Sequence, residues 1–232
     1  MPEANVASIA ASQLPVLCFD TCTALDLMRD PTRDSVRVHE RIAALELLGA
    51  AEGSPRLVLL MAEQVDSEFS EHADGVERET RTALRNLVLR MQKLDAVAAV
   101  YGAMGAANLD HLNDHAVEAR KIADRWVNAA ALVPQGTDIA SKAIKRVLEA
   151  RTPAKKGKDS TKDCLVIETY LDIAAQLRAA GLSTPIVYVS SNVKDYAEET
   201  GSRPRADLAS EFALLNMEFA PNIGAAKHLL SI

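Results

Sequence analysis

The sequence predicts an α/β fold in which helices cover both faces of a parallel sheet. Short, continuous apolar runs alternate with longer stretches that have helical periodicity, and strands that are apolar on both faces are typical of a parallel sheet. Aromatic residues make up only 4% of the chain whereas Ala and Leu are abundant, which favours helices and argues against an all-β sandwich. The 232 residues are enough for one well-buried domain, and we expect residues 1–232 to form a single one.

Four apolar runs are the predicted strands. The first covers residues 16–19 between Pro15 and Asp20, a setting typical of a buried central strand. The other three are residues 57–61, 186–189 and 217–219. Because ligands of parallel sheets bind beyond the carboxyl ends of the strands, the residues that follow these runs are the first candidates for function.

Helices are predicted in the intervening stretches. They cover approximately residues 21–28, 35–48, 111–132, 138–150, 160–180, 208–215 and 224–230. A longer helical region carries an apolar stripe from Leu84 to Tyr101, which we expect, like Trp126, to contact the core or a second copy of the chain. The glycines and the proline within residues 49–55 should end the second of these helices.

The net charge of the chain argues against a general binder of duplex nucleic acid. The formal net charge is −6 and the pI is about 5.4, whereas a general binder of duplex nucleic acid normally carries a basic excess. The local exception is a lysine strip in the polar loop 152–162, formed by Lys155, Lys156, Lys158 and Lys162. This lysine strip is either a solvated loop or a contact for substrate phosphates.

Cysteines and the first residues bear on the cell compartment. Cys18, Cys22 and Cys164 lack the second Cys or His pair of a zinc site, so we expect reduced, structural thiols. Residues 1–15 lack the basic start and apolar core of a signal peptide, and no run approaches the ~20 apolar residues of a membrane span. We therefore expect a cytoplasmic protein that does not enter a membrane.

Acidic residues stand at the predicted strand ends. Asp20 ends the first strand, Glu68 follows the second by a few residues, and Asp163 lies at the start of the helix before the third. If these ends share one edge, the carboxylates converge there, and a hard divalent cation with oxygen ligands relieves their repulsion. Mg²⁺ or Mn²⁺ suits carboxylate and water ligands, so the sequence predicts an acidic site for one of them.

Each acid also has a structural explanation. Asp20 could cap the helix that follows it, Glu68 lies in an acidic helix start that complements the helix dipole, and Asp163 follows Ser160 with the spacing of a capping box. For Asp163 the two roles are compatible, because an acid in the first turn of a helix can still bind a metal ion.

Four segments resemble, in order, the acidic segments of PIN-like domains, and the larger bacterial PIN-like nucleases are the most similar. The segments are VLCFDTCTALDLM, VDSEFSE, KDSTKDCLVIETYLDIA and VYVSSNVKDY. The resemblance covers most of the chain, with residues from about 75 to 150 as a helix-rich insertion without motif support. It implies a three-layer α/β/α fold and metal-dependent cleavage of phosphodiester bonds, most often in single-stranded RNA.

The resemblance also implies roles for individual residues. Asp20, Glu68 and Asp163 correspond to the first three acids, which bind one or two Mg²⁺ or Mn²⁺ ions that activate a water. At the fourth position Asn192 stands where many members have an acid, and Asp195 follows one helical turn later. Either the neutral amide of Asn192 is a metal ligand, or Asp195 supplies the fourth catalytic carboxylate.

Two hypotheses of different classes follow. In the first, the protein is a metal-dependent endoribonuclease, with Thr21 or Thr23 orienting substrate or water, Lys158 and Lys162 attracting the RNA backbone, and Asp159 on the phosphate side. In the second, a PIN-like module binds RNA, a second copy of itself or an antitoxin-like protein with little or no catalysis; Asn192 and the acidic net charge favour it. No P-loop or dinucleotide-binding motif is present, and the second Asp of a haloacid-dehalogenase-like strand end is missing.

Overall fold

The computed structural model describes residues 2–155, 157, 159–199 and 202–232. A five-stranded sheet in the order β3-β2-β1-β4-β5 lies at its centre, and all neighbouring strands are parallel. The strands are β1 (Val16–Phe19), β2 (Val58–Ala62), β3 (Ala131–Val133), β4 (Ile186–Val189) and β5 (Met217–Ala220). The predicted parallel sheet is confirmed, and β1 is its fully buried central strand.

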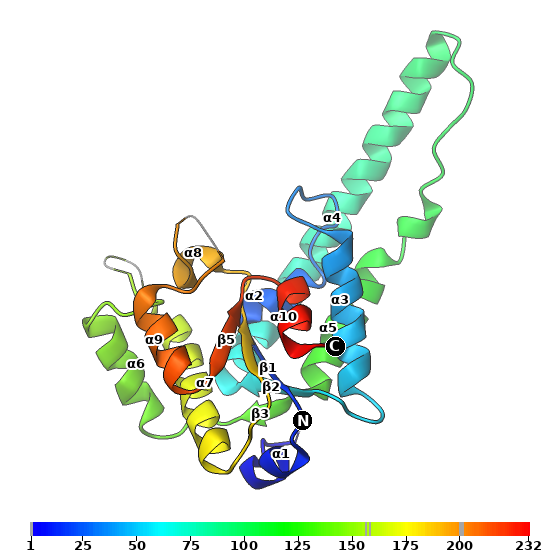
Figure 1. The fold of residues 1–232 in the computed structure, drawn as a ribbon. Helices are drawn as coiled ribbons and strands as arrows, with labels where there is room; N and C mark the ends of the chain where they lie inside the picture. The colour runs from blue at the N-terminus through cyan, green and yellow to red at the C-terminus, as the bar shows by residue number, and fades with distance from the viewer. Residues whose placement is uncertain (1, 156, 158, 200–201) are drawn as a thin grey trace.

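Helices cover both faces of the sheet (Figure 1). One face carries α3 (Val38–Ala51), α5 (His115–Ala129) and α10 (Ile223–Leu230), and the other carries α7 (Thr161–Ala179) with α1 (Val6–Ser12), α6 (Ile139–Leu148) and α9 (Ala206–Leu214) around it. Two short helices, α2 (Thr21–Asp26) and α8 (Val193–Tyr196), follow β1 and β4 at the carboxyl edge of the sheet. The predicted three-layer α/β/α fold is therefore confirmed.

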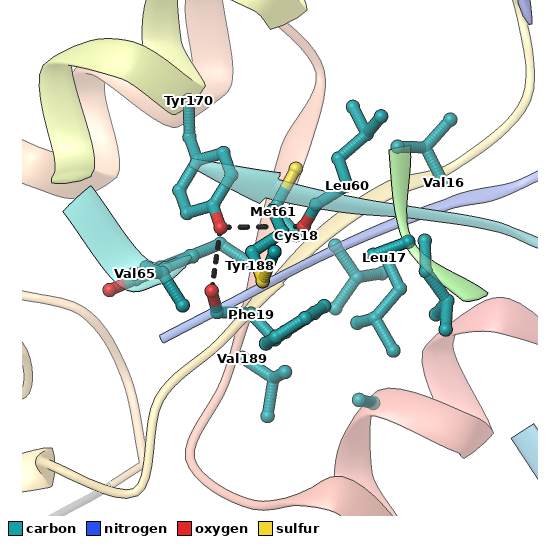
Figure 2. Packing of buried hydrophobic residues seen from close by; sticks show 14 of the residues in the cluster. Val16, Leu17, Cys18, Phe19, Leu60, Met61, Val65, Tyr170, Tyr188 and Val189 are labelled. Carbon is teal, nitrogen blue, oxygen red and sulfur yellow. Dashed lines mark hydrogen bonds between the residues drawn. The ribbon is translucent and has the colours of Figure 1, made fainter. Parts of the chain in front are cut away.

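A buried tyrosine fixes the carboxyl ends of β1 and β2. The hydroxyl of Tyr170, from α7, donates to the carbonyl oxygen of Phe19 at 2.6 Å and accepts from the amide of Ala62 at 3.0 Å. The carbonyl oxygen of Leu60 lies 3.3 Å from the same hydroxyl (Figure 2). Since both strands end at these residues, Tyr170 holds the sheet edge from which the following loops depart.

Tyr170→Phe should therefore destabilise the protein without changing its core volume. The substitution removes a hydroxyl that is hydrogen-bonded to three main-chain groups, and loss of such a partner costs about 1–3 kcal/mol. Urea unfolding of the wild type and the variant measures this difference. An unchanged free energy of unfolding would show that the main-chain groups find other partners.

Helix α4 (Glu63–Val100) is much longer than the apolar stripe that predicted it. Its 38 residues span about 57 Å, and its distal half leaves the body of the molecule before residues 101–114 return (Figure 1). Leu84 is buried, whereas Leu94 and Tyr101 are 58% and 86% exposed. Of the two expected contacts of this stripe, the one with the core is thus wrong beyond the first turns, and the one with a second copy of the chain stays a prediction. Trp126 is a core residue, as expected.

Several predicted boundaries also differ. Residues 131–132, expected at the end of a helix, belong to β3, because a short edge strand and the end of an apolar helix have the same local pattern. Gly49 does not end α3, which continues to Ala51; one glycine costs a helix only about 1 kcal/mol. The helix ends before Gly53, whose φ of +70° is left-handed. Helix α1 has no counterpart among the predicted helices.

Among the described residues, no helix is long and apolar enough to cross a membrane.

Candidate active site

The candidate site lies where the strand order reverses. From β1 the chain moves outward to β2 and β3, and it then returns to place β4 on the other side of β1. Loops that leave two such neighbouring strands diverge to opposite faces of the sheet and open a crevice between them, which is where ligands of these sheets bind. Asp20 follows β1 and Ser190 follows β4, so both residues stand at this crevice.

Asp20 is a buried carboxylate held by neutral donors. Its Oδ1 accepts from the amide of Thr21 at 2.7 Å, and its Oδ2 accepts from Ser190 Oγ at 2.7 Å and Cys22 Sγ at 3.1 Å. Burial raises the pKa of Asp20, the three hydrogen bonds oppose this, and the charge of Glu68 raises it further. No Lys, Arg or His forms an ion pair with Asp20 within the described parts of the chain. A buried carboxylate that is held only by neutral donors is suited to bind a cation.

The capping explanation for Asp20 is also correct. Asp20 is the N-cap of α2, and its side chain accepts the amide hydrogen bond of Thr21. That bond uses one carboxylate oxygen, and the other faces the loop after β4 through Ser190. The cap therefore fixes the carboxylate in the crevice and does not compete with a role there.

Glu68 is joined to Asp20 through a single threonine. Thr21 donates its hydroxyl to Glu68 Oε2 at 2.7 Å, while its amide binds Asp20. The side-chain amide of Gln64, one turn earlier in α4, donates to Glu68 Oε1 at 3.0 Å. The structure thus brings Asp20 and Glu68 to opposite sides of Thr21, with both carboxylates oriented by hydrogen bonds.

Asp163 lies at the same edge of the sheet, in the first turn of α7. Its neighbour Lys162 lies 3.9 Å from Glu68 and 3.6 Å from Glu71, measured from Nζ to the carboxylate oxygens, so the starts of α4 and α7 face each other. The charges of Asp20 and Asp163 both raise the pKa of Tyr196, after the larger effect of its burial. Even so, no three His, Cys, Asp or Glu side chains of the described residues come close enough to hold a metal ion as they stand.

Asn192 and Asp195 form one hydrogen-bonded pair. The side-chain amide of Asn192 donates to Asp195 Oδ2 at 2.8 Å, and Lys155 Nζ lies 2.7 Å from Asp195 Oδ1. The main-chain amide of Asn192 also donates to Ser190 Oγ at 3.1 Å. A continuous series of hydrogen bonds therefore connects Asp20, through Ser190 and Asn192, to the buried carboxylate of Asp195.

Among the described residues, two further predicted substrate residues, Asp159 and Lys162, have no hydrogen bond or ion pair with this series. Asp159 is exposed and accepts the amide of Thr161 at 3.0 Å, so it caps α7, whereas Ser160 makes no side-chain cap bond. Lys162 faces the carboxylates of α4. Lys158 lies outside the described residues.

Two residues that contact Asp20 directly, Ser190 and Cys22, are not predicted from the sequence. By sequence alone Ser190 belongs to a polar turn and Cys22 is a reduced thiol, yet both donate to the carboxylate of Asp20. The available signal is the position of Ser190 directly after a predicted strand. Its partner cannot be identified without knowing that β4 lies beside β1.

Comparison with known proteins agrees with this architecture. A family model described as the PIN domain matches residues 17–196, which is more than half of the chain and includes all of the acids discussed above. No curated protein and no solved structure matches the chain significantly. The chain therefore belongs to the PIN domain family.

Proposed function

We propose that this protein is a metal-dependent endoribonuclease that cleaves single-stranded RNA in the cytoplasm, with Asp20, Glu68 and Asp163 as ligands of Mg²⁺ or Mn²⁺. PIN domains are usually metal-dependent nucleases. The observation that carries the proposal is Asp20: a buried carboxylate at the switch point of the sheet, held by neutral donors and joined to Glu68 by Thr21. Oxygen-rich acidic sites of this kind suit hard divalent cations.

The protein's own residues would position the reacting groups. A bound divalent ion would lower the pKa of a water and stabilise negative charge on the phosphate oxygens. Thr21 holds the carboxylates of Asp20 and Glu68 in fixed orientations, and Ser190 holds the second oxygen of Asp20. Lys162, next to Glu68, would attract the phosphate backbone of the RNA. Orientation by such neighbours typically changes metal affinity or activity about 10–100-fold.

A circular single-stranded RNA tests the reaction type. Incubation with Mn²⁺ should convert circles into linear RNA, which only an endonuclease can do, and EDTA should prevent this. A DNA circle of the same sequence should remain intact if the substrate is RNA. Intact RNA circles at saturating Mn²⁺, with a protein that binds RNA equally well in EDTA, would support the second candidate.

That second candidate is a PIN domain that binds RNA or a protein, including a second copy or an antitoxin-like partner, with little catalysis. The ion pair between Asp195 and Lys155, together with the neutral Asn192, favours it. A cation is already bound to the fourth carboxylate, which weakens the case for a metal ion there. The metal-dependent nuclease is preferred because Asp20, at the centre of the site, has no ion pair with a cationic side chain among the described residues.

The fourth position can be tested with Asn192→Asp. This substitution replaces the donor amide 2.8 Å from Asp195 Oδ2 by a carboxylate, so like charges repel and the metal-free protein should melt at a lower temperature. Mn²⁺ should offset the loss if position 192 faces the metal. The readout is thermal unfolding with EDTA and with Mn²⁺. If Mn²⁺ does not restore the melting temperature of the variant, residue 192 stabilises the loop and does not face the metal.

A further inference from the structure

A pocket of about 570 Å³ opens beside the candidate active site. Cys22, Ser191 and Asn192 form the wall nearest the acids, and these residues come from the loops after β1 and β4. Another wall is formed by residues from the stretch 26–41, which covers the end of α2, the connection to α3 and the first turn of α3 (Figure 1). Cys22 donates to Asp20, so the pocket is continuous with the crevice that holds the acids.

The charge of this pocket is opposite to that of the chain. Four arginines at every fourth position line it, against two acids, Asp26 and Glu40, whereas the whole chain carries a net charge of −6. The arginines, called the arginine pocket below, are Arg29, Arg33, Arg37 and Arg41.

These arginines have few partners among the described residues. Arg37 donates to the carbonyl oxygen of Asp34 at 2.9 Å. Arg29 Nε lies 3.1 Å from Asp26 Oδ1 but is buried without a hydrogen bond of suitable direction. Most of the donors of the arginine pocket are therefore available to a ligand.

Arg41 is the strongest indication of a ligand. It is half-buried, burial lowers the pKa of its guanidinium, and the charges of Asp26 and Glu40 only partly oppose this. In the described parts of the chain, its guanidinium has no hydrogen bond or ion pair. Arginine stays protonated in proteins, and a desolvated cation without a bonded anion is costly. An anion in the pocket would remove this cost.

The lining of the pocket indicates which anion. No aromatic residue of the described chain contributes to it, so it offers no aromatic ring on which a base could stack. Guanidinium groups match the oxygens of a phosphate in a bidentate manner, and such contacts fix the position of a nucleic acid without reading its sequence. By contrast, the two lysines of the strip that the structure describes are engaged with acids, because Lys155 pairs with Asp195 and Lys162 lies beside Glu68 and Glu71.

We propose that the arginine pocket is a phosphate-binding subsite that holds the RNA backbone beside the cleaved bond, without preference for base. This assignment rests on the proposed ribonuclease function. The strand would enter the crevice from the side of α2 and α3, and the phosphates next to the scissile one would bind Arg33 and Arg41. From the sequence, the lysine strip is either a solvated loop or a phosphate contact. In this proposal the arginine pocket is the main phosphate contact.

Binding without cleavage tests the assignment. Fluorescence anisotropy would measure the affinity of a labelled oligo(U) of about twelve nucleotides, and then of oligo(A), for the Asp20→Asn protein in EDTA over a range of salt concentrations. Arg33→Gln and Arg41→Gln should each weaken binding and reduce the slope of log K against log salt by about 0.7, the value for one phosphate contact on a single strand. The affinity of each variant for oligo(U) and for oligo(A) should fall by the same factor.

The matched control is Arg56→Gln. Arg56 is exposed just before β2, at the opposite edge of the sheet, and its substitution removes the same charge. Equal losses in the control and in the pocket variants, or no loss in the pocket variants, would overturn the assignment. Arg33 is exposed, so its variant also reports if Arg41→Gln misfolds. Arginine-dependent binding in a protein that never cleaves RNA circles would refute the nuclease proposal alone, and cleavage with arginine-independent binding would refute the pocket alone.

Discussion

Asp20→Asn should abolish metal-dependent RNA cleavage, with a loss of at least ~100-fold, and should leave the fold intact. Asparagine can still accept the Thr21 amide hydrogen bond that caps α2 but brings no negative charge to a cation. Removal of one group that stabilises charge in an active site costs roughly 10²–10³-fold in rate, and a lost metal ligand should cost no less. Initial rates of circle opening at saturating Mn²⁺ give the comparison.

The same substitution should stabilise the metal-free protein at neutral pH. Burial raises the pKa of Asp20 above 3.8, so the folded state binds this proton more tightly than the unfolded chain does. The stability that results is fully present below the unfolded pKa and is lost as the pH rises through the folded pKa. The asparagine side chain of the variant carries no charge at any of these pH values. In EDTA, the variant should therefore exceed the wild type in free energy of unfolding by the largest amount at neutral pH, and the difference should vanish in acid.

Added Mn²⁺ should reverse the order of the two proteins. An ion that binds only the folded wild type adds about 2.7 kcal/mol at a hundredfold excess over Kd, or roughly 5–10 °C in melting temperature for a chain of this size. Asp172→Asn, a change further along α7 and away from the crevice, is the control and should respond to Mn²⁺ as the wild type does. Equal Mn²⁺ shifts in wild type and Asp20→Asn would contradict the assignment of Asp20 as a metal ligand.

The sequence predicted the features that depend on local pattern. Continuous apolar runs identified β1, β2 and β4, and a short apolar pattern interrupted by Glu218 identified β5. An acid directly after β1 identified Asp20. It could not predict β3, because three residues paired along one edge carry no period of their own. Nor could it predict that Ser190 binds Asp20, since the two residues are 170 positions apart and meet only through the pairing of β1 with β4.

The partners in ion pairs could not be predicted from the local sequence pattern either. The composition of the lysine strip is that of a solvated or phosphate-binding loop, but Lys155 lies on Asp195 because α8 brings that carboxylate to it. By local pattern Arg146 is one more helical arginine, and it is 1% exposed because α7 and α9 each place a glutamate against it. Such partners follow from the packing of helices that are distant in sequence.

Arg146→Met should lower the free energy of unfolding by about 3–5 kcal/mol, a larger loss than that expected for Tyr170→Phe. The guanidinium of Arg146, on α6, donates to Glu168 Oε1 of α7 at 2.6 Å and to both carboxylate oxygens of Glu211 of α9 at 3.0 and 2.8 Å. It also donates to the carbonyl oxygen of Thr152 at 2.6 Å. Methionine fills a similar space but leaves the buried carboxylate of Glu168 without its cation.

In a chain of this size the loss corresponds to a fall in melting temperature of roughly 6–20 °C. Arg125→Met is the matched control, because Arg125 forms an exposed ion pair with Glu52 and such pairs contribute at most about 1 kcal/mol. Arg146→Lys should recover little, since a single ammonium cannot reproduce three guanidinium nitrogens that bond three different groups.

Two further measurements separate the ion network from simple packing. Combining Arg146→Met with Glu168→Met should recover part of the stability, because replacing a whole buried pair by apolar residues is often neutral or favourable, whereas breaking it is not. Arg146 also holds the carbonyl of Thr152, three residues before the lysine that contacts Asp195. Exchange of the backbone amides of residues 151, 152, 154 and 155 should therefore accelerate in Arg146→Met and stay unchanged in Arg125→Met. A double variant no more stable than the single one, or a loss no larger than that of the control, would mean that the ion network does not stabilise the fold.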